Sequence, residues 1–283
     1  MPEIAIVTDS DSSLPAGLAA QMGIRQVPIT IHFPDRSYSA GVDLDDRQAF
    51  ELVDRLRKIP TTAAPAPAAF AAAYEAAFAE GAQAVVCVCV SSKISATHAA
   101  ALSAAEQMGG RTVRVIDSLN LSMGQGFMAL EAAEAAAQGA SLDQVCERVQ
   151  ALNGRLHTYA FLPTLKYLAM SGRVGKLAAG IGNTLNIQPI LSVKDGKLEL
   201  LERIRTRARA FERVLQLAAA AAQGKPVQRA AIIHSAAPEA AAEMEARLRQ
   251  TLDCPEKVII AEFSAGLSVH AGLGVVGVVI QTA

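Results

Sequence analysis

The strongest constraint on the fold is a regular alternation of short apolar segments with longer alanine-rich segments. The apolar segments have strand length and lie at residues 3–7, 25–32, 84–90 and 112–116. The alanine-rich segments have helical period and lie at residues 46–58, 68–80, 96–108 and 126–138. Strands that alternate with helices pair in parallel, because each helix carries the chain back across the sheet. The pattern predicts an α/β fold with mostly parallel sheets, whose ligand loops follow the carboxyl ends of the strands.

A second unit is predicted from about residue 155. Residues 159–170 are interpreted as helical or mixed, and a turn at 194–197 joins the two strands of a β-hairpin. Helices at 208–223 and 238–252 then alternate with strands at 229–234, 257–262 and 275–281. At 283 residues the chain is near the length at which one hydrophobic core stops growing. We therefore expect two α/β domains, residues 1–154 and 155–283, with a ligand enclosed near their interface.

Charge and hydropathy exclude several classes of function. The 26 Lys and Arg residues against 27 Asp and Glu residues give a formal net charge of −1, which leaves no basic footprint for nucleic acid. The N-terminus lacks a basic region followed by a long apolar run, and no apolar stretch is long enough to span a membrane. We expect a cytoplasmic protein with no nucleic-acid partner and no stable membrane insertion.

The cysteines and histidines do not predict a metal site. Cys87, Cys89, Cys146 and Cys254 form no CxxC pair, and the histidines outside the C-terminal region have no ligand spacing. Cys87 and Cys89 lie two residues apart in an apolar strand, which predicts two buried core side chains on one face. Neither a metal nor a cofactor is expected.

The segment Gly272-Leu273-Gly274-Val275-Val276-Gly277 matches the spacing of a dinucleotide-binding loop. That spacing has meaning only where it follows a strand and opens a helix, with an acidic residue about 20 positions later. Here residues 275–280 have the pattern of a strand and the sequence ends at Ala283. We interpret the glycines as a close backbone turn beside a ligand or another strand.

Two hydroxyl-rich loops are better candidates for a binding site. Thr61 and Thr62 follow Pro60, and the segment Ser91-Ser92-Lys93-Ile94-Ser95-Ala96-Thr97 joins an apolar strand to a helix. Backbone N–H groups at the start of a helix and short hydroxyl side chains can hold a carboxylate or phosphate oxygen. Each hydroxyl alone is more often a helix cap or a turn residue.

His270 lies in a predicted loop between the last two strands, within Ser268-Val269-His270-Ala271-Gly272. Its small neighbours would let the imidazole donate to an anion without steric hindrance. The alternative is an exposed or packing histidine without a role in binding.

Taken in order along the chain, these segments resemble the DegV family, which includes the fatty-acid-binding subunits of bacterial fatty acid kinase. The resemblance covers the whole sequence, although no single motif is highly specific. It is carried by Thr8-Asp9-Ser10 with Leu14-Pro15, Gly41-Val42-Asp43, Thr62-Ala63-Ala64-Pro65, Ser91 to Thr97, Asp117-Ser118 with Ser122 to Gly126, Tyr167-Leu168, Ser171-Gly172-Arg173-Val174, Leu185 to Leu191 and His270 to Gly274.

The resemblance implies a lipid-binding protein that is not an enzyme alone and has no catalytic residue. It would enclose one long-chain fatty acid such as palmitate, with Thr62, Ser95 and His270 as carboxylate ligands. A separate ATP-binding kinase subunit would phosphorylate the carboxylate to an acyl phosphate, which serves phospholipid synthesis. Arg173 is similar to the family position implicated in binding the kinase subunit, and we expect its guanidinium to be exposed.

The sequence also departs from the family pattern near the expected site. Alanine replaces a polar or flexible residue at Ala40, Ala63, Ala64 and Ala96, and Leu273 replaces a proline. These departures leave Thr62, Ser95 and His270 in place, but they change the loops that carry them.

Two other classes of function remain open. A serine hydrolase acting on acyl esters would use Ser95 as nucleophile and His270 as base, although there is no GxSxG motif, no evident orienting carboxylate and a helix-cap context for Ser95. A protein-interaction module would leave the domain interface empty. A lipid extract of the purified protein distinguishes a binder from both.

Overall fold

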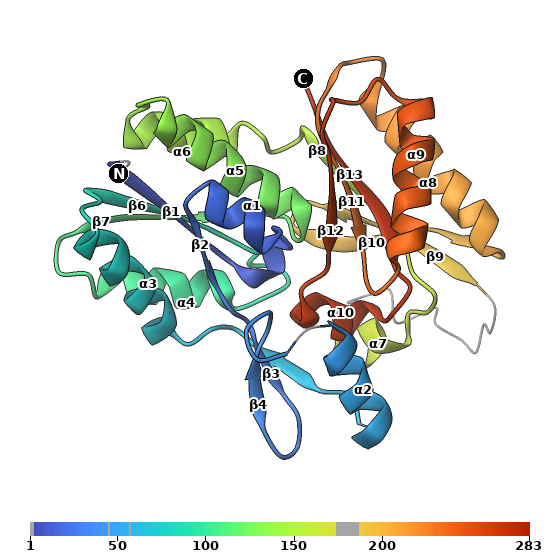
Figure 1. The fold of residues 1–283 in the computed structure, drawn as a ribbon, viewed down its shortest axis with the longest axis horizontal. Coiled ribbons are helices and arrows are strands. Elements are labelled where there is room, and N and C mark those ends of the chain that lie inside the picture. The colour runs from blue at the N-terminus through green and yellow to red at the C-terminus, as the bar shows by residue number, and fades with distance from the viewer. Residues whose placement is uncertain (1–2, 45, 57, 174–186) are drawn as a thin grey trace.

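The apolar segments of the first half form a four-stranded parallel sheet in the computed structural model, which describes residues 3–44, 46–56, 58–173 and 187–283. The strands are β1 (Ile4–Asp9), β2 (Ile24–Val27), β6 (Ala84–Cys89) and β7 (Thr112–Asp117), in the spatial order β2-β1-β6-β7 (Figure 1). Each neighbouring pair is parallel, as the alternation of strands and helices predicts. The α/β class is confirmed.

Helices cover both faces of this sheet. One face packs against α3 (Pro67–Ala79) and α4 (Thr97–Glu106), and the other against α1 (Ala16–Gln21) and α5 (Met123–Ala137). Helix α6 (Leu142–Gln150) packs beside α5. In β6, Val85, Cys87 and Cys89 face α3 and α4, whereas Val86 and Val88 face α5. Both cysteines are buried on one face, which confirms the prediction from their spacing.

The second half forms a six-stranded mixed sheet. Its strands are β8 (Leu156–Phe161), β9 (Gln188–Lys194), β10 (Lys197–Ile204), β11 (Val227–His234), β12 (Val258–Glu262) and β13 (Val276–Thr282), in the order β10-β9-β8-β13-β11-β12. The pair β11 and β12 is parallel, and the other pairs are antiparallel. The prediction of mostly parallel pairing is therefore wrong for this sheet. One reason is the tight turn between β9 and β10, where Asp195 and Gly196 both have positive φ, because so short a turn joins only antiparallel strands.

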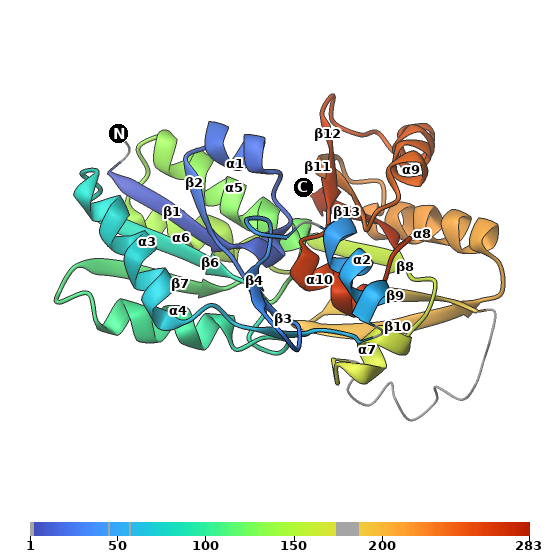
Figure 2. The ribbon, with the colours of Figure 1, turned by 60° about the horizontal axis from the view of Figure 1, so that its bottom comes forward.

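Helix α5 lies between the two large sheets. Helices α8 (Arg207–Ala222) and α9 (Pro238–Thr251) cover the outer face of the second sheet, and α5 packs on its inner face (Figures 1 and 2). Every residue from 123 to 130 is buried. A helix in this position contacts protein on all sides, which explains why its sequence lacks a polar face in this stretch.

A small three-stranded sheet of the N-terminal half contacts the C-terminal helix α10 (Ala265–Ala271). The order of its antiparallel strands β3 (Thr30–His32), β4 (Ser37–Ser39) and β5 (Thr61–Ala63) is β4-β3-β5. Together with α2 (Asp46–Leu56) it packs on α10 through a cluster that includes Ile31, Ala265 and Val269 (Figure 2).

Two predicted elements differ in the structure. Residues 25–32 were predicted as one strand but are divided between β2 and β3, because Pro28 has no N–H for a sheet hydrogen bond. Residues 159–170 contain the end of β8 and the short helix α7 (Lys166–Met170). Val174 and residues 185–186, which belong to two motifs of the resemblance, lie outside the described residues.

Candidate functional site

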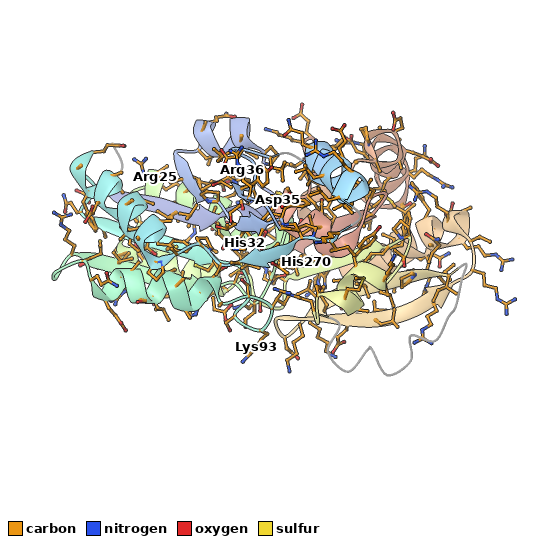
Figure 3. All side chains as sticks on the ribbon, turned by 90° about the horizontal axis from the view of Figure 1, so that it is seen from below. Arg25, His32, Asp35, Arg36, Lys93 and His270 are labelled. Carbon is orange, nitrogen blue, oxygen red and sulfur yellow. The ribbon has the colours of Figure 1, made fainter. Side chains whose placement is uncertain are left out.

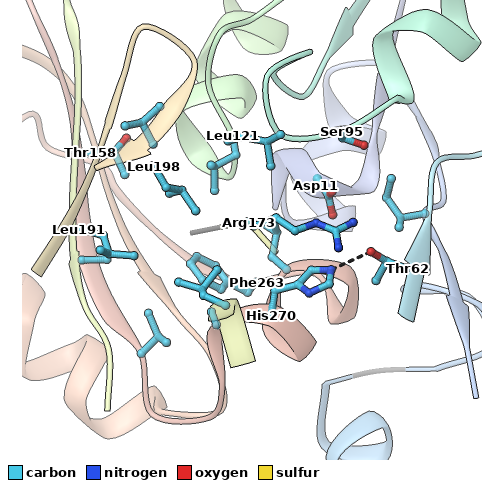
Figure 4. A pocket seen from close by; sticks show the side chains of 18 of the residues that line it. Asp11, Thr62, Ser95, Leu121, Thr158, Arg173, Leu191, Leu198, Phe263 and His270 are labelled. Atoms are coloured by element: carbon cyan, nitrogen blue, oxygen red, sulfur yellow. Dashed lines mark hydrogen bonds between the residues drawn. The ribbon is translucent and has the colours of Figure 1, made fainter. Parts of the chain in front are cut away.

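A cavity of about 410 Å³ lies between the two large sheets. Small-molecule sites have volumes of roughly 300–1,000 Å³, so a ligand of modest size fits here. Most of the wall is apolar and includes Leu121, Leu162, Leu191, Leu198, Ile233 and Phe263. In Figure 4 Leu191 and Leu198 lie on one side of the cavity together with Thr158, and the charged side chains gather at the other side with Thr62 and Ser95.

Strand alternation determines which side chains reach the cavity. In β8, Thr158 and Ala160 line the cavity, whereas Tyr159 and Phe161 pack on the opposite face with α8 and α9. Leu191 lies opposite Ala160 in the neighbouring strand β9 and lines the cavity as well. The wall is therefore the inner face of the second sheet.

The glycine-rich segment at residues 272–277 is a turn followed by a strand, as the sequence predicts. Gly277 is in β13, and a Cβ atom on it would lie 2.6 Å from the Ala160 Cβ. The glycine allows β13 and β8 to approach closely beneath the cavity. The segment opens no helix and forms no nucleotide-binding loop.

The polar end of the cavity is formed by Asp11, Thr62, Ser95, Arg173 and His270 (Figure 4). The three residues predicted as carboxylate ligands thus line one cavity. Thr62 Oγ1 and His270 Nε2 are 2.7 Å apart and form a hydrogen bond between residues 208 positions apart in sequence. This bond joins β5 of the first half to α10 of the second.

His270 lies in the last turn of α10, and the prediction that it lies in a loop is wrong. Ser264 caps the start of the helix, where its side chain accepts a hydrogen bond from the Leu267 N–H, and Gly272, with a φ of +88°, caps its end. A Cβ atom at Gly272 would lie 2.9 Å from the Tyr167 ring. The serine cap and the glycine end place His270 at the edge of the cavity.

His270 is neutral near pH 7. Burial, and after it the neighbouring Arg173 guanidinium, lower the pKa of the imidazole to about 4. Nδ1 is buried and has no hydrogen-bond partner among the described residues. In the tautomer whose Nε2–H donates to Thr62 Oγ1, the hydrogen of the Thr62 hydroxyl is free to point toward an anion.

Ser95 comes from the hydroxyl-rich loop between β6 and α4. Its Oγ lies 2.8 Å from Thr97 Oγ1 and accepts a hydrogen bond from the Thr97 N–H at 3.3 Å. Lys93 of the same loop is exposed and projects from the surface, whereas His270 lies near the middle of the molecule (Figure 3). The loop therefore offers hydroxyl groups to the cavity and directs its cation to solvent.

Arg173 is half-buried and lines the cavity, so the expectation of an exposed guanidinium is wrong. One of its terminal nitrogens donates to the Ser171 carbonyl oxygen at 2.7 Å, and Figure 4 shows the guanidinium pointing toward the space between Asp11, Thr62 and His270. Arg173 gives the polar end a permanent positive charge, which the hydroxyls of Thr62 and Ser95 and the neutral His270 do not supply.

Asp11 is a residue of the polar end to which no role was assigned from the sequence. It lies in η1 (Ser10–Ser12), is 8% exposed, and accepts a hydrogen bond from the Ser264 hydroxyl at 2.9 Å. Burial, followed by repulsion from Asp9, raises the pKa of the Asp11 carboxyl to about 7. The signal in the sequence was a second aspartate directly after the carboxyl end of β1, a position where ligand loops gather in parallel sheets.

Ser95 and His270 are not hydrogen-bonded to each other, as a nucleophile and its general base would be. Ser95 bonds Thr97, and His270 Nε2 bonds Thr62. Within the described ranges no carboxylate accepts a hydrogen bond from His270, so nothing there orients the imidazole as in a catalytic triad. The described part of the chain contains no group of three potential metal ligands. It also contains no helix long and apolar enough to cross a membrane.

Replacement of Thr158 is predicted to increase the stability of the fold. Its Oγ1 is enclosed and has no partner among the described residues, although the side chain is 5% exposed and lies in the cavity wall. We expect Thr158→Val to raise the free energy of unfolding by about 1 kcal/mol, because the shape is kept and an unsatisfied hydroxyl is removed. Urea denaturation measures the change. Thr97→Val is the matched control: its hydroxyl bonds Ser95, and its loss should lower the stability.

Comparisons with known proteins agree with these observations. The model of a family described as "Uncharacterised protein, DegV family" matches residues 3–283. A DegV domain-containing protein of Streptomyces coelicolor is 34% identical over 279 residues, which cover 99% of this chain and 98% of that protein.

Solved structures show the same fold. A DegV family protein of Thermus thermophilus, described by its fatty acid binding, is 31% identical with a TM-score of 0.93 over 100% of both chains. DegV of Bacillus subtilis, described as a fatty acid binding protein, is 29% identical with a TM-score of 0.88 over 100% of both chains.

Proposed function

Because this chain belongs to the DegV family, we propose that it binds one long-chain fatty acid in the cavity between its two large sheets. The observation that carries the proposal is the division of that cavity into an apolar wall and a polar end. A fatty acid has the same division between its chain and its carboxylate. The fatty acid binding of the similar proteins from Thermus thermophilus and Bacillus subtilis supports the assignment.

The apolar wall accounts for most of the affinity. Burial of a methylene contributes about 0.8 kcal/mol, so about 15 methylenes give a gross gain on the order of 12 kcal/mol. Ordering the ligand costs roughly 4–15 kcal/mol, which is the same order as this gain, so the hydrogen bonds to the carboxylate also contribute to the net affinity. Leu191, Ile233 and Phe263 are among the buried residues that would contact the chain.

The polar end accounts for the position of the carboxylate. A buried carboxylate needs hydrogen-bond donors, and Thr62 and Ser95 each have a hydroxyl at the cavity. Arg173 adds a charge-assisted partner, and His270 holds the Thr62 hydroxyl in place. We place Thr62, Ser95, His270 and Arg173 at the acid, with residues 1–154 and 155–283 as the two domains that enclose it.

We further propose that the bound carboxylate is presented to a separate kinase subunit. Thr61, Ala96 and Gly172, which adjoin residues of the polar end, are exposed, so the carboxylate would lie near the surface. A carboxylate oxygen would attack the terminal phosphorus of ATP held by the partner, giving an acyl phosphate and ADP. The family resemblance supports this step, and this chain would supply the substrate and no catalytic group.

Mass spectrometry of lipid released from the purified, denatured protein tests the binding proposal. One fatty acid per chain is expected, and delipidated protein should bind added palmitate with the same stoichiometry. Protein that neither retains nor binds an acid would be an interaction module with an empty cavity. Turnover of acyl esters with a burst of product would instead favour the hydrolase.

Removal of single hydroxyl groups tests the polar end. Thr62→Ala or Ser95→Ala should weaken palmitate binding by roughly 1–3 kcal/mol, because a buried carboxylate oxygen loses a donor. His270→Ala should have a similar or larger effect, since it also releases the Thr62 hydroxyl. Titration of delipidated protein measures each affinity. Ser92→Ala is the control, because Ser92 is exposed in the same loop and should leave binding unchanged; equal affinities in all variants would refute the assignment.

A further inference from the structure

Asp11 places a second carboxylate at the site proposed for the acid. Its side chain lines the cavity, and α10 approaches it so closely that a Cβ atom at Gly266 would lie 2.9 Å from Asp11 Oδ1. The Ser264 hydroxyl donates to the same oxygen at 2.9 Å. The glycine and serine of α10 therefore hold Asp11 at the cavity, where it faces Arg173 (Figure 4).

The environment of Asp11 differs from that of its neighbour Asp9. Asp9 accepts hydrogen bonds from the N–H groups of Val90 and Asp11 and from the Gln125 side chain. The Asp11 carboxylate accepts one, from Ser264, and no ion pair within the described residues includes it. Both carboxyls are buried, but Asp11 has far fewer donors to stabilise its charge.

Among the residues that the structure describes, three titratable or charged groups face Asp11. Asp9 at the end of β1 repels it, Arg173 after α7 attracts it, and His270 of α10 is neutral. Helix α5 also packs on η1, and its first turn from Met123 to Gly126 carries no charge. The pKa of Asp11 is raised to about 7, so the carboxyl gains and loses its proton near neutral pH.

We propose that Asp11 is a proton-carrying member of the acid-binding site: when an acyl carboxylate binds, Asp11 takes up one proton from solvent and donates it in a hydrogen bond to the ligand. The inference rests on the proposed function. Two carboxylates beside one guanidinium cannot both keep their charge at low energy, and sharing one proton removes the repulsion. Arg173 then neutralises the single negative charge that remains.

Proton uptake by Asp11 determines how the affinity for the acid changes with pH. At pH values below the pKa that Asp11 has in the ligand-free protein, Asp11 already carries its proton, and the affinity for the acid does not change with pH. Above it each binding event must draw a proton from solvent, so affinity should fall by about tenfold per pH unit until the pKa of the complex is reached. Alkaline conditions would therefore release the acid.

Titration calorimetry with laurate, in two buffers of different ionisation enthalpy, counts the protons. At about pH 8.5 wild-type protein should take up about one proton per laurate, and at about pH 6.5 the uptake should be much smaller. Asp11→Asn should take up none at either pH, and at the higher pH, about 1.5 units above the pKa of Asp11, it should bind laurate about thirtyfold more tightly than wild type. Ser264→Ala removes a donor that favours the charged carboxylate, so it should shift the fall in affinity to higher pH.

The outcomes separate this inference from the proposed function. Wild-type protein that binds laurate at no pH refutes the proposed function. Binding without proton uptake, with equal affinity at both pH values, overturns the role of Asp11 and leaves fatty acid binding standing. Uptake that persists in Asp11→Asn assigns the proton to another group, such as the buried Asp9 carboxyl or His270, and also overturns it.

Discussion

Replacement of Ala160 by phenylalanine should weaken palmitate binding severely while the chain remains folded. Ala160 lies in the wall, and its Cβ atom is directed toward the cavity beside Leu191. A phenyl ring there would occupy the space of the acyl chain and, if it displaces about five methylenes, would reduce affinity by about 4 kcal/mol, or roughly a thousandfold. Titration of delipidated protein with palmitate measures the loss.

The opposite face of the same strand provides the control. Tyr159 packs toward α8, away from the cavity, and Tyr159→Phe should leave palmitate binding unchanged. Octanoate is a second probe, because a short acid reaches less of the wall and should lose less affinity in Ala160→Phe. If palmitate binds Ala160→Phe as tightly as wild type, with both proteins folded by circular dichroism, the acid does not occupy this cavity.

Much of the fold could be predicted because local patterns determine it. The period of two in β6 predicted the common face of Cys87 and Cys89, and the alternation of strands with helices predicted the parallel first sheet. The strand order of the second sheet could not be predicted in this way. β13 inserts between β8 and β11, a pairing across more than 100 residues that depends on tertiary packing and leaves no local pattern.

The site was predicted in part, for a related reason. Thr62, Ser95 and His270 belong to motifs, and the structure brings all three to one cavity. The positions of Arg173 and Asp11 depend on how the halves meet, since Ser264 reaches Asp11 from 253 residues away. An arginine in a Ser-Gly-Arg turn predicts a surface charge, and only the packing of α7 and α10 turns it toward the cavity.

We expect the alanines that depart from the family pattern to increase the contribution of Arg173 to carboxylate binding. Ala63 and Ala64 line the cavity, and Ala96 is exposed at the start of α4. The first two present methyl groups where the family pattern has a hydroxyl and an amide. With fewer neutral donors in that loop, a carboxylate depends more on the remaining hydroxyls and on the guanidinium.

Arg173→Ala should therefore reduce palmitate binding by about 2 kcal/mol, the lower end of the effect of truncating one partner of a buried charge pair, because Arg173 is only half-buried. Arg173→Lys should restore part of the loss, because an ammonium supplies charge without the planar pair of donors. Bound lipid per chain after purification and titration of delipidated protein measure both effects. Lys166→Ala is the control: it removes an exposed cation of α7 that does not line the cavity.

A second readout separates binding the acid from contacting the kinase subunit. With ATP and a cognate kinase, Arg173→Ala should form acyl phosphate slowly at low palmitate and recover toward the wild-type rate as palmitate saturates the cavity, because saturation replaces the lost affinity. A variant that retains its lipid but forms little acyl phosphate at saturation would place Arg173 on the partner surface instead. Wild-type affinity together with a wild-type rate would remove Arg173 from both roles, and the acid would then rely on Thr62, Ser95 and a protonated Asp11 alone.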